Sequence, residues 1–200
     1  MTIKAWQCLF PVVTLTLLAY QFLSGQSAGP SSFNAKLVGA NEVPAVSTKG
    51  SGEFRGTLQS NGTEIAFELE YADVSGPATM AHIHFGQRFA TGGVVVHLCG
   101  TGGTAACPGS AGKVAGLFGA SRVVDVAGQG ISAGEFAELL AALRAGNAYV
   151  NVHTAQSPQG EIRGQVRPGR GVGGDDNEDE EGKGKGKGKG KRQGKLVDCL

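Results

Sequence analysis

Two of the four histidines in this 200-residue chain lie two residues apart in the segment Ala81–Gly86. If the segment is a β-strand, His82 and His84 share one face and the apolar residues between them share the other. A third histidine, His153, follows valines in the segment Tyr149–Thr154, again opposite the apolar positions. Neutral imidazoles suit copper or zinc, and three histidines with an open position can form a catalytic metal site. The pattern therefore offers His82, His84 and His153 as ligands of one copper or zinc ion.

The fourth histidine, His97, lies on the segment Gly93–Cys99, opposite two valines and a leucine, which makes it a candidate fourth ligand. The alternation places all four histidines outside the apolar core, on strand faces that we expect to meet solvent. A strand histidine also commonly bonds to a neighbouring carboxylate, and Glu161, which we expect to point outward with Arg163 from the strand Glu161–Val166, is available for that structural role. We leave both interpretations open. No serine or cysteine nucleophile arrangement and no pair of catalytic carboxylates is evident, so the sequence favours a protein without enzymatic activity.

The histidine segments belong to a series of short strands separated by Gly, Pro and Asn turns. The clearest strand is Glu64–Tyr71, whose apolar residues alternate with glutamates and an alanine, and it follows an Asn61-Gly62 hairpin signal. Asn61-Gly62-Thr63 is also an N-glycosylation sequon, so Asn61 is a glycosylation site if the source is eukaryotic. Pro44 indicates that the segment Asn41–Val46 lies at a sheet edge or in a bulge. Seven or eight such strands predict an all-β, antiparallel Greek-key β-sandwich, either immunoglobulin-like or similar to Cu/Zn superoxide dismutase.

One helix is expected in this otherwise all-β chain. Ser132 and Glu135 form a capping-box pattern, apolar residues recur at helical spacing from Phe136 to Leu143, and Gly146 occupies the position of a C-terminal cap. These signals predict a short amphipathic helix whose apolar side packs on the core.

The N-terminus has the pattern of an export signal. Lys4 precedes an apolar run, Cys8–Ala19, and small residues at Gly25 and Ser27 form a cleavage site. We therefore predict a signal peptide over residues 1–27, a secreted protein and no membrane association after cleavage. An uncleaved anchor is the alternative.

Cysteine usage agrees with an oxidising compartment. Cys99 and Cys107 enclose a short, glycine-rich loop, and we predict a disulfide between them. Closing so short a loop would stabilise the folded state by about 2–3 kcal/mol. Cys199, near the C-terminus, is either free or joins two chains as a dimer.

The predicted folded region, residues 33–167, carries nine Lys or Arg and ten Asp or Glu, so no nucleic-acid partner is expected. Residues 168–200 differ abruptly. An acidic block, Asp175–Glu181, precedes five Gly-Lys repeats in Gly182–Lys191, and we predict disorder for this tail. Its lysines could contact an acidic polysaccharide, or its two halves could simply pair loosely with each other; the second interpretation is preferred.

Five motifs, in order along the chain, resemble the CHRD domain family, which is named for chordin. They are Asn41-Glu-Val-Pro-Ala-Val46, Ala81-His-Ile-His84, Gly93-Val-Val-Val-His-Leu-Cys99, Gly146-Asn-Ala-Tyr-Val-Asn-Val-His-Thr154 and Pro158-Gln-Gly-Glu-Ile-Arg-Gly-Gln-Val166. The resemblance spans about residues 33–166. It implies an immunoglobulin-like β-sandwich in an extracellular protein, and it brings no established catalytic residues.

The histidine spacing also resembles Cu/Zn superoxide dismutase, in which two strand histidines and a late-strand histidine bind copper. That resemblance would place copper on His82, His84 and His153, with His97 as a bridging ligand, although the loop carrying the zinc ligands is missing. Two functions follow. The first, which we favour from sequence, is a non-enzymatic extracellular binding or matrix module with a protein or acidic polysaccharide partner. The second is a copper- or zinc-binding domain with dismutase-like redox activity.

Overall fold

The structure is a computed structural model that describes residues 29–169. The predicted signal peptide, the predicted dimerising residue Cys199 and all but the first two residues of the charged tail lie outside the described residues.

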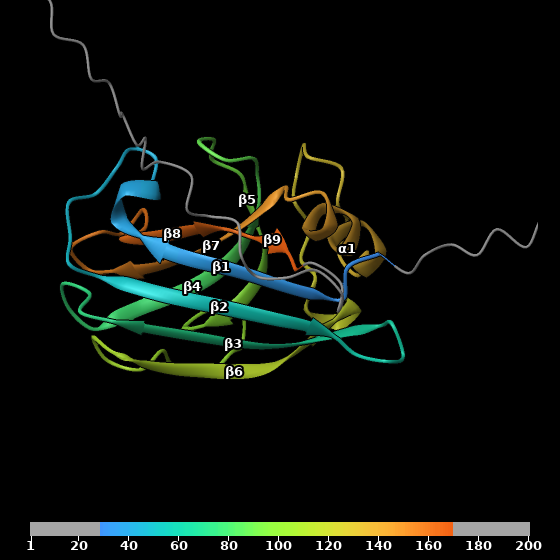
Figure 1. The fold of residues 1–200 in the computed structure, drawn as a ribbon, viewed down its shortest axis with the longest axis horizontal. Coiled ribbons are helices and arrows are strands. Elements are labelled where there is room, and N and C mark those ends of the chain that lie inside the picture. The colour runs from blue at the N-terminus through green and yellow to red at the C-terminus, as the bar shows by residue number, and fades with distance from the viewer. Residues whose placement is uncertain (1–28, 170–200) are drawn as a thin grey trace, which may run out of the picture.

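Nine strands, one α-helix and two 3-10 turns make up the described part of the chain (Figure 1). The strands are β1 (Ser32–Val38), β2 (Ser51–Leu58), β3 (Glu64–Ala72), β4 (Ala78–Phe85), β5 (Gly93–Cys99), β6 (Gly112–Gly119), β7 (Ala148–Thr154), β8 (Ile162–Gln165) and β9 (Arg167–Pro168). The helix is α1 (Phe136–Arg144), and the 3-10 turns are η1 (Gly39–Asn41) and η2 (Ala120–Arg122).

All strand pairs are antiparallel, in the order β5-β4-β7-β8-β1-β2-β3-β6, and the short β9 pairs with β1. The sheet curls until its two edge strands, β5 and β6, approach each other. Figure 1 shows β1, β2, β3 and β6 as one layer in front of the β4, β5 and β7 layer. β6 lies beside β3 although β4 and β5 intervene in sequence, which is the strand order of a Greek key. The predicted all-β, antiparallel fold with a single short helix is confirmed.

The core lies between these layers, and strand alternation in the front layer is clearest in β1. Every second residue of β1 is buried, as the period of a strand requires. In β3, Ile65 and Leu69 are fully buried and Tyr71 nearly so, as predicted. The hairpin before β3 also has the predicted turn, in which Gly62 takes a φ of 71° that favours glycine.

Helix α1 covers one end of the sheet (Figure 1) and buries its apolar side. It begins at Phe136, later than the capping pattern suggested, and only half of the predicted box forms: the Glu135 carboxylate accepts a hydrogen bond from the Ser132 backbone N–H at 2.7 Å. Gly146, with a φ of 70°, ends the helix as expected.

The expectation that the histidine faces of β4 and β7 meet solvent is wrong. His82, His84 and His153 are 4%, 8% and 5% exposed, and every residue of β7 is buried. The faces do alternate as predicted, but the outer face is covered by loops that strand periodicity does not reveal. In β5, bulges opposite β4 also break the alternation, so that Val95 is buried.

Within residues 29–169, no helix is long and apolar enough to span a membrane.

Candidate metal centre

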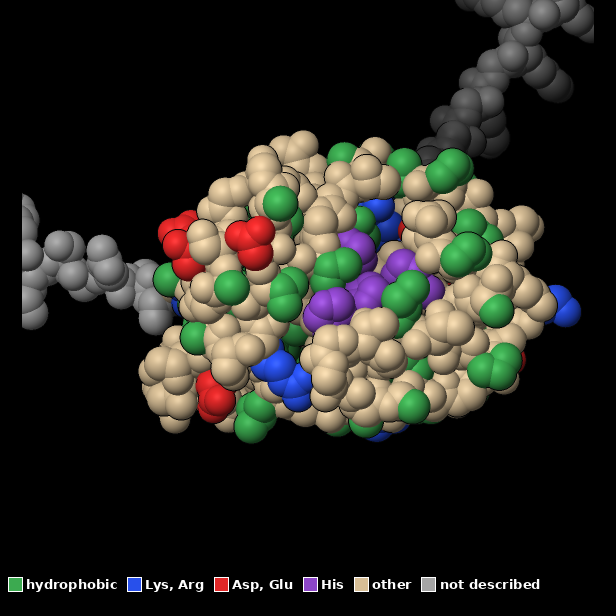
Figure 2. All heavy atoms as spheres, turned by 180° about the vertical axis from the view of Figure 1, so that it is seen from behind, with side chains coloured by type: hydrophobic (Ala, Val, Ile, Leu, Met, Phe, Trp, Pro, Cys, Tyr) green, Lys and Arg blue, Asp and Glu red, His purple; other side chains and the backbone are tan. Residues whose placement is uncertain are grey.

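The three predicted ligands come together on the outer face of the β4–β7 pair. The register places His82 opposite Asn151 and Met80 opposite His153, so His82 and His153 are diagonal neighbours on one face. His84 follows two residues along β4 on the same face. One ring nitrogen from each of His82, His84 and His153 lies within 4.8 Å of the other two. Figure 2 shows the histidine side chains gathered at the centre of this face.

Each of the three histidines is held by a different loop. His82 Nε2 lies 2.9 Å from the hydroxyl of Thr101, in the loop after β5. His84 Nδ1 lies 2.9 Å from the carbonyl oxygen of Gly92, in the loop before β5, and His153 Nδ1 lies 3.1 Å from that of Pro158, before β8. A carbonyl oxygen only accepts, so Nδ1 of His84 and of His153 must carry the hydrogen. The lone pair of each neutral ring is then on Nε2.

Two of the three nitrogens that the loops leave free have no hydrogen-bond partner among the described residues, and the third faces an amide. Among the described residues, His82 Nδ1 and His84 Nε2 are buried ring nitrogens without a hydrogen bond. His153 Nε2 lies 3.0 Å from the Oδ1 of Asn151, a contact between two acceptors unless the ring is protonated or the amide turns by half a rotation. Buried polar atoms are normally satisfied, so this cluster of unpaired lone pairs calls for a ligand.

The spacing of these nitrogens approaches that of a single-ion site. Three imidazole nitrogens spread evenly around one metal at about 2.0–2.1 Å lie about 3.5 Å apart. The observed separations, all within 4.8 Å, therefore need to close by up to about 1.3 Å for the three rings to bind one ion. The loop hydrogen bonds act on the far nitrogen of each ring, as is usual around metal-bound histidines.

The environment keeps these rings neutral, as metal ligands must be. Burial, together with the neighbouring histidines, lowers the pKa of His82 to about 3. Burial likewise lowers the pKa of His84 to about 4, although the hydrogen bond to Gly92 opposes the shift, and it lowers the pKa of His153. At neutral pH all three imidazoles are therefore uncharged, with one N–H and one lone pair each.

His97, the predicted fourth ligand, is not part of this group. Its ring stands edge-on to that of His82, with centroids 4.9 Å apart, and its Nδ1 lies 2.8 Å from the Thr101 hydroxyl. One Thr101 hydroxyl therefore serves two histidines. If it accepts from His82 Nε2–H, it can donate to His97 Nδ1, which leaves His82 Nδ1 as a lone pair.

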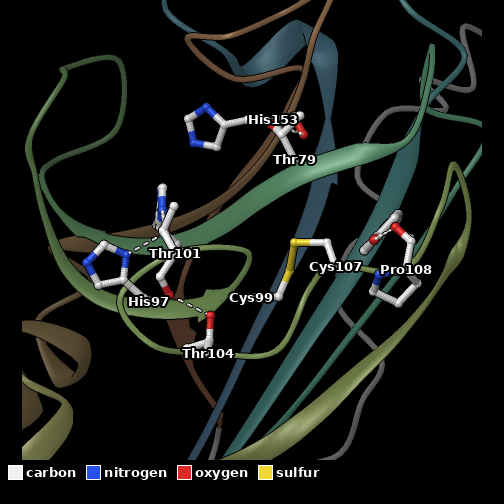
Figure 3. Close-up of a disulfide and its surroundings, with 10 residues drawn as sticks. Thr79, His97, Cys99, Thr101, Thr104, Cys107, Pro108 and His153 are labelled. Carbon is white, nitrogen blue, oxygen red and sulfur yellow. Dashed lines mark hydrogen bonds between the residues drawn. A yellow bond between two sulfur atoms is a disulfide. The ribbon is translucent and has the colours of Figure 1, made fainter.

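The predicted disulfide closes the loop that carries this threonine. Cys99 and Cys107 are joined, and Figure 3 shows Thr101 between them in sequence, with its side chain beside His97. Within the loop, the Thr104 hydroxyl donates to the Thr101 carbonyl oxygen at 2.6 Å. The disulfide thus fixes the loop whose hydroxyl orients His82.

Replacing Thr101 by valine tests that orienting role. The substitution keeps the side-chain shape but removes the hydroxyl, and loss of such a partner typically weakens metal binding about 10–100-fold. We expect a loss of this size in a copper competition titration. Thr104→Val, which removes a hydroxyl from the same loop without touching a histidine, should bind copper as the wild type does; equal losses in both variants would assign the effect to the loop as a whole.

A stack of three side chains leads away from the site. The Tyr149 ring lies parallel to that of His84, with centroids 4.7 Å apart, and the Arg163 guanidinium lies 3.4 Å from the centroid of the Tyr149 ring. Arg163 also donates to the carbonyl oxygens of Gln87 and Ala90. The expectation that Arg163 is exposed is wrong, because this stack and the loop before β5 bury it to 2% exposure.

Glu161 does not partner a histidine, and it is not exposed as predicted. Its carboxylate, 1% exposed, accepts hydrogen bonds from the hydroxyls of Thr48, Ser75 and Thr154 and from the Ser75 backbone N–H. Burial alone would raise the pKa of Glu161, but these bonds outweigh it and lower the pKa. Glu161 therefore ties three segments together and leaves the histidines free.

Glu42 is a second buried carboxyl, placed beside Asn151. Gly160 lies so close to both that any side chain there would collide with them. Burial raises the pKa of Glu42 to about 7, although Arg163 and Asn151 oppose the shift. A carboxyl that keeps its proton near neutral pH is a neutral hydrogen-bonding group beside the Asn151 amide.

The Glu42 shift predicts a pH-dependent stability. The folded carboxyl holds its proton to about pH 7 and the unfolded one loses it near 4.5, so the folded state binds more protons between these values and stability falls as pH rises. Relative to Glu42→Gln, the wild type should lose up to about 3 kcal/mol between pH 4.5 and 8. Urea unfolding of both proteins across this range gives the difference; parallel curves would contradict the buried, protonated carboxyl.

The supporting residues were not identified from the sequence as part of the site. Thr101, Tyr149, Asn151 and Glu42 carry no metal-ligand spacing, and their role follows only from the loops and register that bring them to the histidines. The signal that could have pointed to three of them is their place inside the motifs that resemble the CHRD domain, at Tyr149, Asn151 and Glu42. Asn61, the predicted glycosylation site, is exposed in the turn after β2, and its glycosylation stays a prediction.

Comparison with known proteins gives one match. The family model of the CHRD domain matches residues 33–166, which is more than half of the chain. No curated protein and no solved structure matches.

Proposed function

Because this chain belongs to the CHRD domain family, we propose that its domain is an extracellular module that binds one copper ion through His82, His84 and His153. Zinc in the same position is the alternative. The proposal is carried by the different surroundings of the two nitrogens in each ring. One nitrogen contacts a loop, and the other lies close to the corresponding nitrogens of the other two rings.

A purely structural role explains this arrangement less well. A structural histidine gains stability by satisfying both ring nitrogens, whereas His82 and His84 each leave one buried nitrogen unpaired. Burying an unpaired polar atom costs about 1–3 kcal/mol. A metal ion would convert two such costs, and the competing contact of His153 with Asn151, into bonds.

The charge of the site favours monovalent copper over a divalent ion. The three ligands are uncharged, and the positive charge of Arg163 is felt at His84, where it lowers the pKa. A buried ion without a carboxylate ligand is less costly when it carries one charge than when it carries two. We therefore expect Cu(I) to bind more tightly than Zn(II).

The extracellular setting rests on two features. The sequence begins with a predicted signal peptide over residues 1–27, the domain contains a disulfide between Cys99 and Cys107, and disulfides persist in oxidising compartments. The histidine group is the one group of three such ligands in the described part of the chain, so the proposal is for a single metal ion.

Metal stoichiometry tests the proposal. The full chain, untagged and secreted in oxidised form, is stripped with a chelator and incubated with Cu(I) under ascorbate or with Zn(II). After dialysis, metal and protein are counted by mass spectrometry. We expect one copper per chain and displacement of zinc by an equal amount of Cu(I); substoichiometric copper and zinc would reject metal binding, and zinc retained against Cu(I) would reject the preference.

A further inference from the structure

A second candidate site lies away from the histidines, in a cavity of about 410 Å³ over β1, β8 and β9. A cavity of this size falls in the range that holds small ligands. Its lining is polar and basic, and no carboxylate contributes to it. The lining residues are Asn34, Ala35, Lys36, Asn41, Arg88, Arg163, Gln165 and Arg167.

Four cations converge on this cavity from distant parts of the sequence: Lys36 from β1, Arg88 from the loop before β5, Arg163 from β8 and Arg167 from β9. They are four of the nine Lys and Arg residues in a region that is otherwise close to neutral. Spread along the sequence they give no basic cluster, and only the fold brings them together. Concentrated positive charge in a concave site raises the local concentration of anions.

These cations are not neutralised within the described residues. The ion pairs there all involve Arg55 or Lys113, on the outer face of β2, β3 and β6. Glu53 is opposite Lys36 in the strand register, but its carboxylate pairs with Arg55 at 2.6 Å. Lys36, Arg88 and Arg167 therefore face the cavity without an ion-pair partner in the described residues, and the carboxyl that acts on the charge of Arg163 is the buried Glu42.

One of the four cations is fixed within the protein, and a second packs on an exposed aromatic ring. Arg163 is held by the carbonyl oxygens of Gln87 and Ala90 and by the Tyr149 ring, so its charge is in place before a ligand arrives. Arg88 lies over the ring of Phe89, 4.7 Å from its centroid. Phe89 is 68% exposed with a φ of 65°, a conformation that a bulky residue rarely adopts outside functional loops.

We propose that this cavity binds the acidic sugar unit of an extracellular polysaccharide, with Lys36, Arg88 and Arg167 around its carboxylate or sulfate. The amides of Asn34 and Asn41 supply donors and acceptors for sugar hydroxyls, and Phe89, which packs against the lining residue Arg88, carries an exposed apolar ring. A nucleic acid fits less well, because its recognition needs a row of phosphate contacts and several stacking rings, and this cavity receives one charged unit. The proposal does not rest on the metal centre, although Arg163 borders both sites.

Monosaccharide probes test the site without interference from the lysines of the tail, which every variant shares. Glucuronate and glucose 6-sulfate are titrated into the full chain, and backbone amide shifts of the β1 and β8 residues are followed by NMR, with glucose and inorganic sulfate as reference ligands. Lys36→Gln/Arg88→Gln should weaken glucuronate binding at least tenfold. The matched control Lys49→Gln/Arg122→Gln, which removes the same charge from exposed positions outside the cavity lining, should leave it unchanged.

Other outcomes overturn the proposal. Equal affinities in the two double variants would reduce the effect to overall charge. Glucose binding as tightly as glucuronate, or inorganic sulfate as tightly as glucose 6-sulfate, would remove the acidic sugar as the ligand. A tetrathymidylate that displaces glucuronate at lower concentration than an equally charged glucuronate oligosaccharide would assign the cavity to nucleic acid.

Discussion

Replacing His82 and His153 together by alanine is expected to abolish metal binding, while His97→Ala leaves it intact. The double variant removes two of three ligands, and one remaining imidazole cannot hold the ion. His97 lies beside His82 but outside the ligand group, so it is a matched control of the same chemistry in the same cluster. Bound metal should stabilise the wild type by about 4 kcal/mol when free metal is a thousand times Kd. The double variant should gain nothing.

Thermal or urea unfolding with and without Cu(I) measures this gain. Because alanine leaves cavities at two buried positions, His82→Gln/His153→Gln serves as a second variant that keeps a polar side chain of similar size. Its apo form should unfold cooperatively and show no metal-dependent gain. A gain in either double variant as large as in the wild type would place the metal elsewhere on the chain.

Replacing Cys99 and Cys107 by serine is expected to affect both stability and metal affinity. The cysteines are eight residues apart, and opening so short a loop costs about 2–3 kcal/mol in the chain-entropy model. The loop also carries Thr101, whose hydroxyl bonds to His82. Once the loop is free, ordering it opposes metal binding, and we expect copper affinity to fall about tenfold or more.

Urea unfolding of the apo proteins measures the first effect and a copper competition titration measures the second. The stability loss is a property of the loop closure alone, so it should appear without metal. A tenfold loss of affinity in the disulfide variant should not add fully to that of Thr101→Val, because both act through the same hydroxyl. An unchanged copper affinity in the disulfide variant would show that this loop does not contribute to metal binding.

Most of the fold could be predicted from strand periodicity. The alternation in β3, the Asn61-Gly62 turn and the apolar spacing in α1 each reflect a local rule, and the structure follows them. The same rule separated the histidines of β4 and β7 from the core face. Local rules fail where the determinant is not local: the bulges in β5 move Val95 into the core, and they arise from pairing with β4.

Burial of the candidate site could not be predicted from the sequence. Gly92, Thr101 and Pro158 cover the histidines from three loops, and nothing in the spacing of those loops indicates where they fold. Glu161 and Arg163 were expected to be exposed because they are charged and lie opposite apolar residues. Each is buried because a long-range partner compensates its charge, through hydroxyls for Glu161 and through Tyr149 and two carbonyls for Arg163.

The account depends on three imidazoles meeting at one metal ion, and X-ray absorption spectroscopy of the Cu(I)-loaded full chain measures that directly. We predict three nitrogen ligands at about 2.0–2.1 Å with the outer-shell scattering of imidazole rings, unchanged in His97→Ala. A first shell containing sulfur, or one with fewer than three imidazoles, would contradict the site built from His82, His84 and His153.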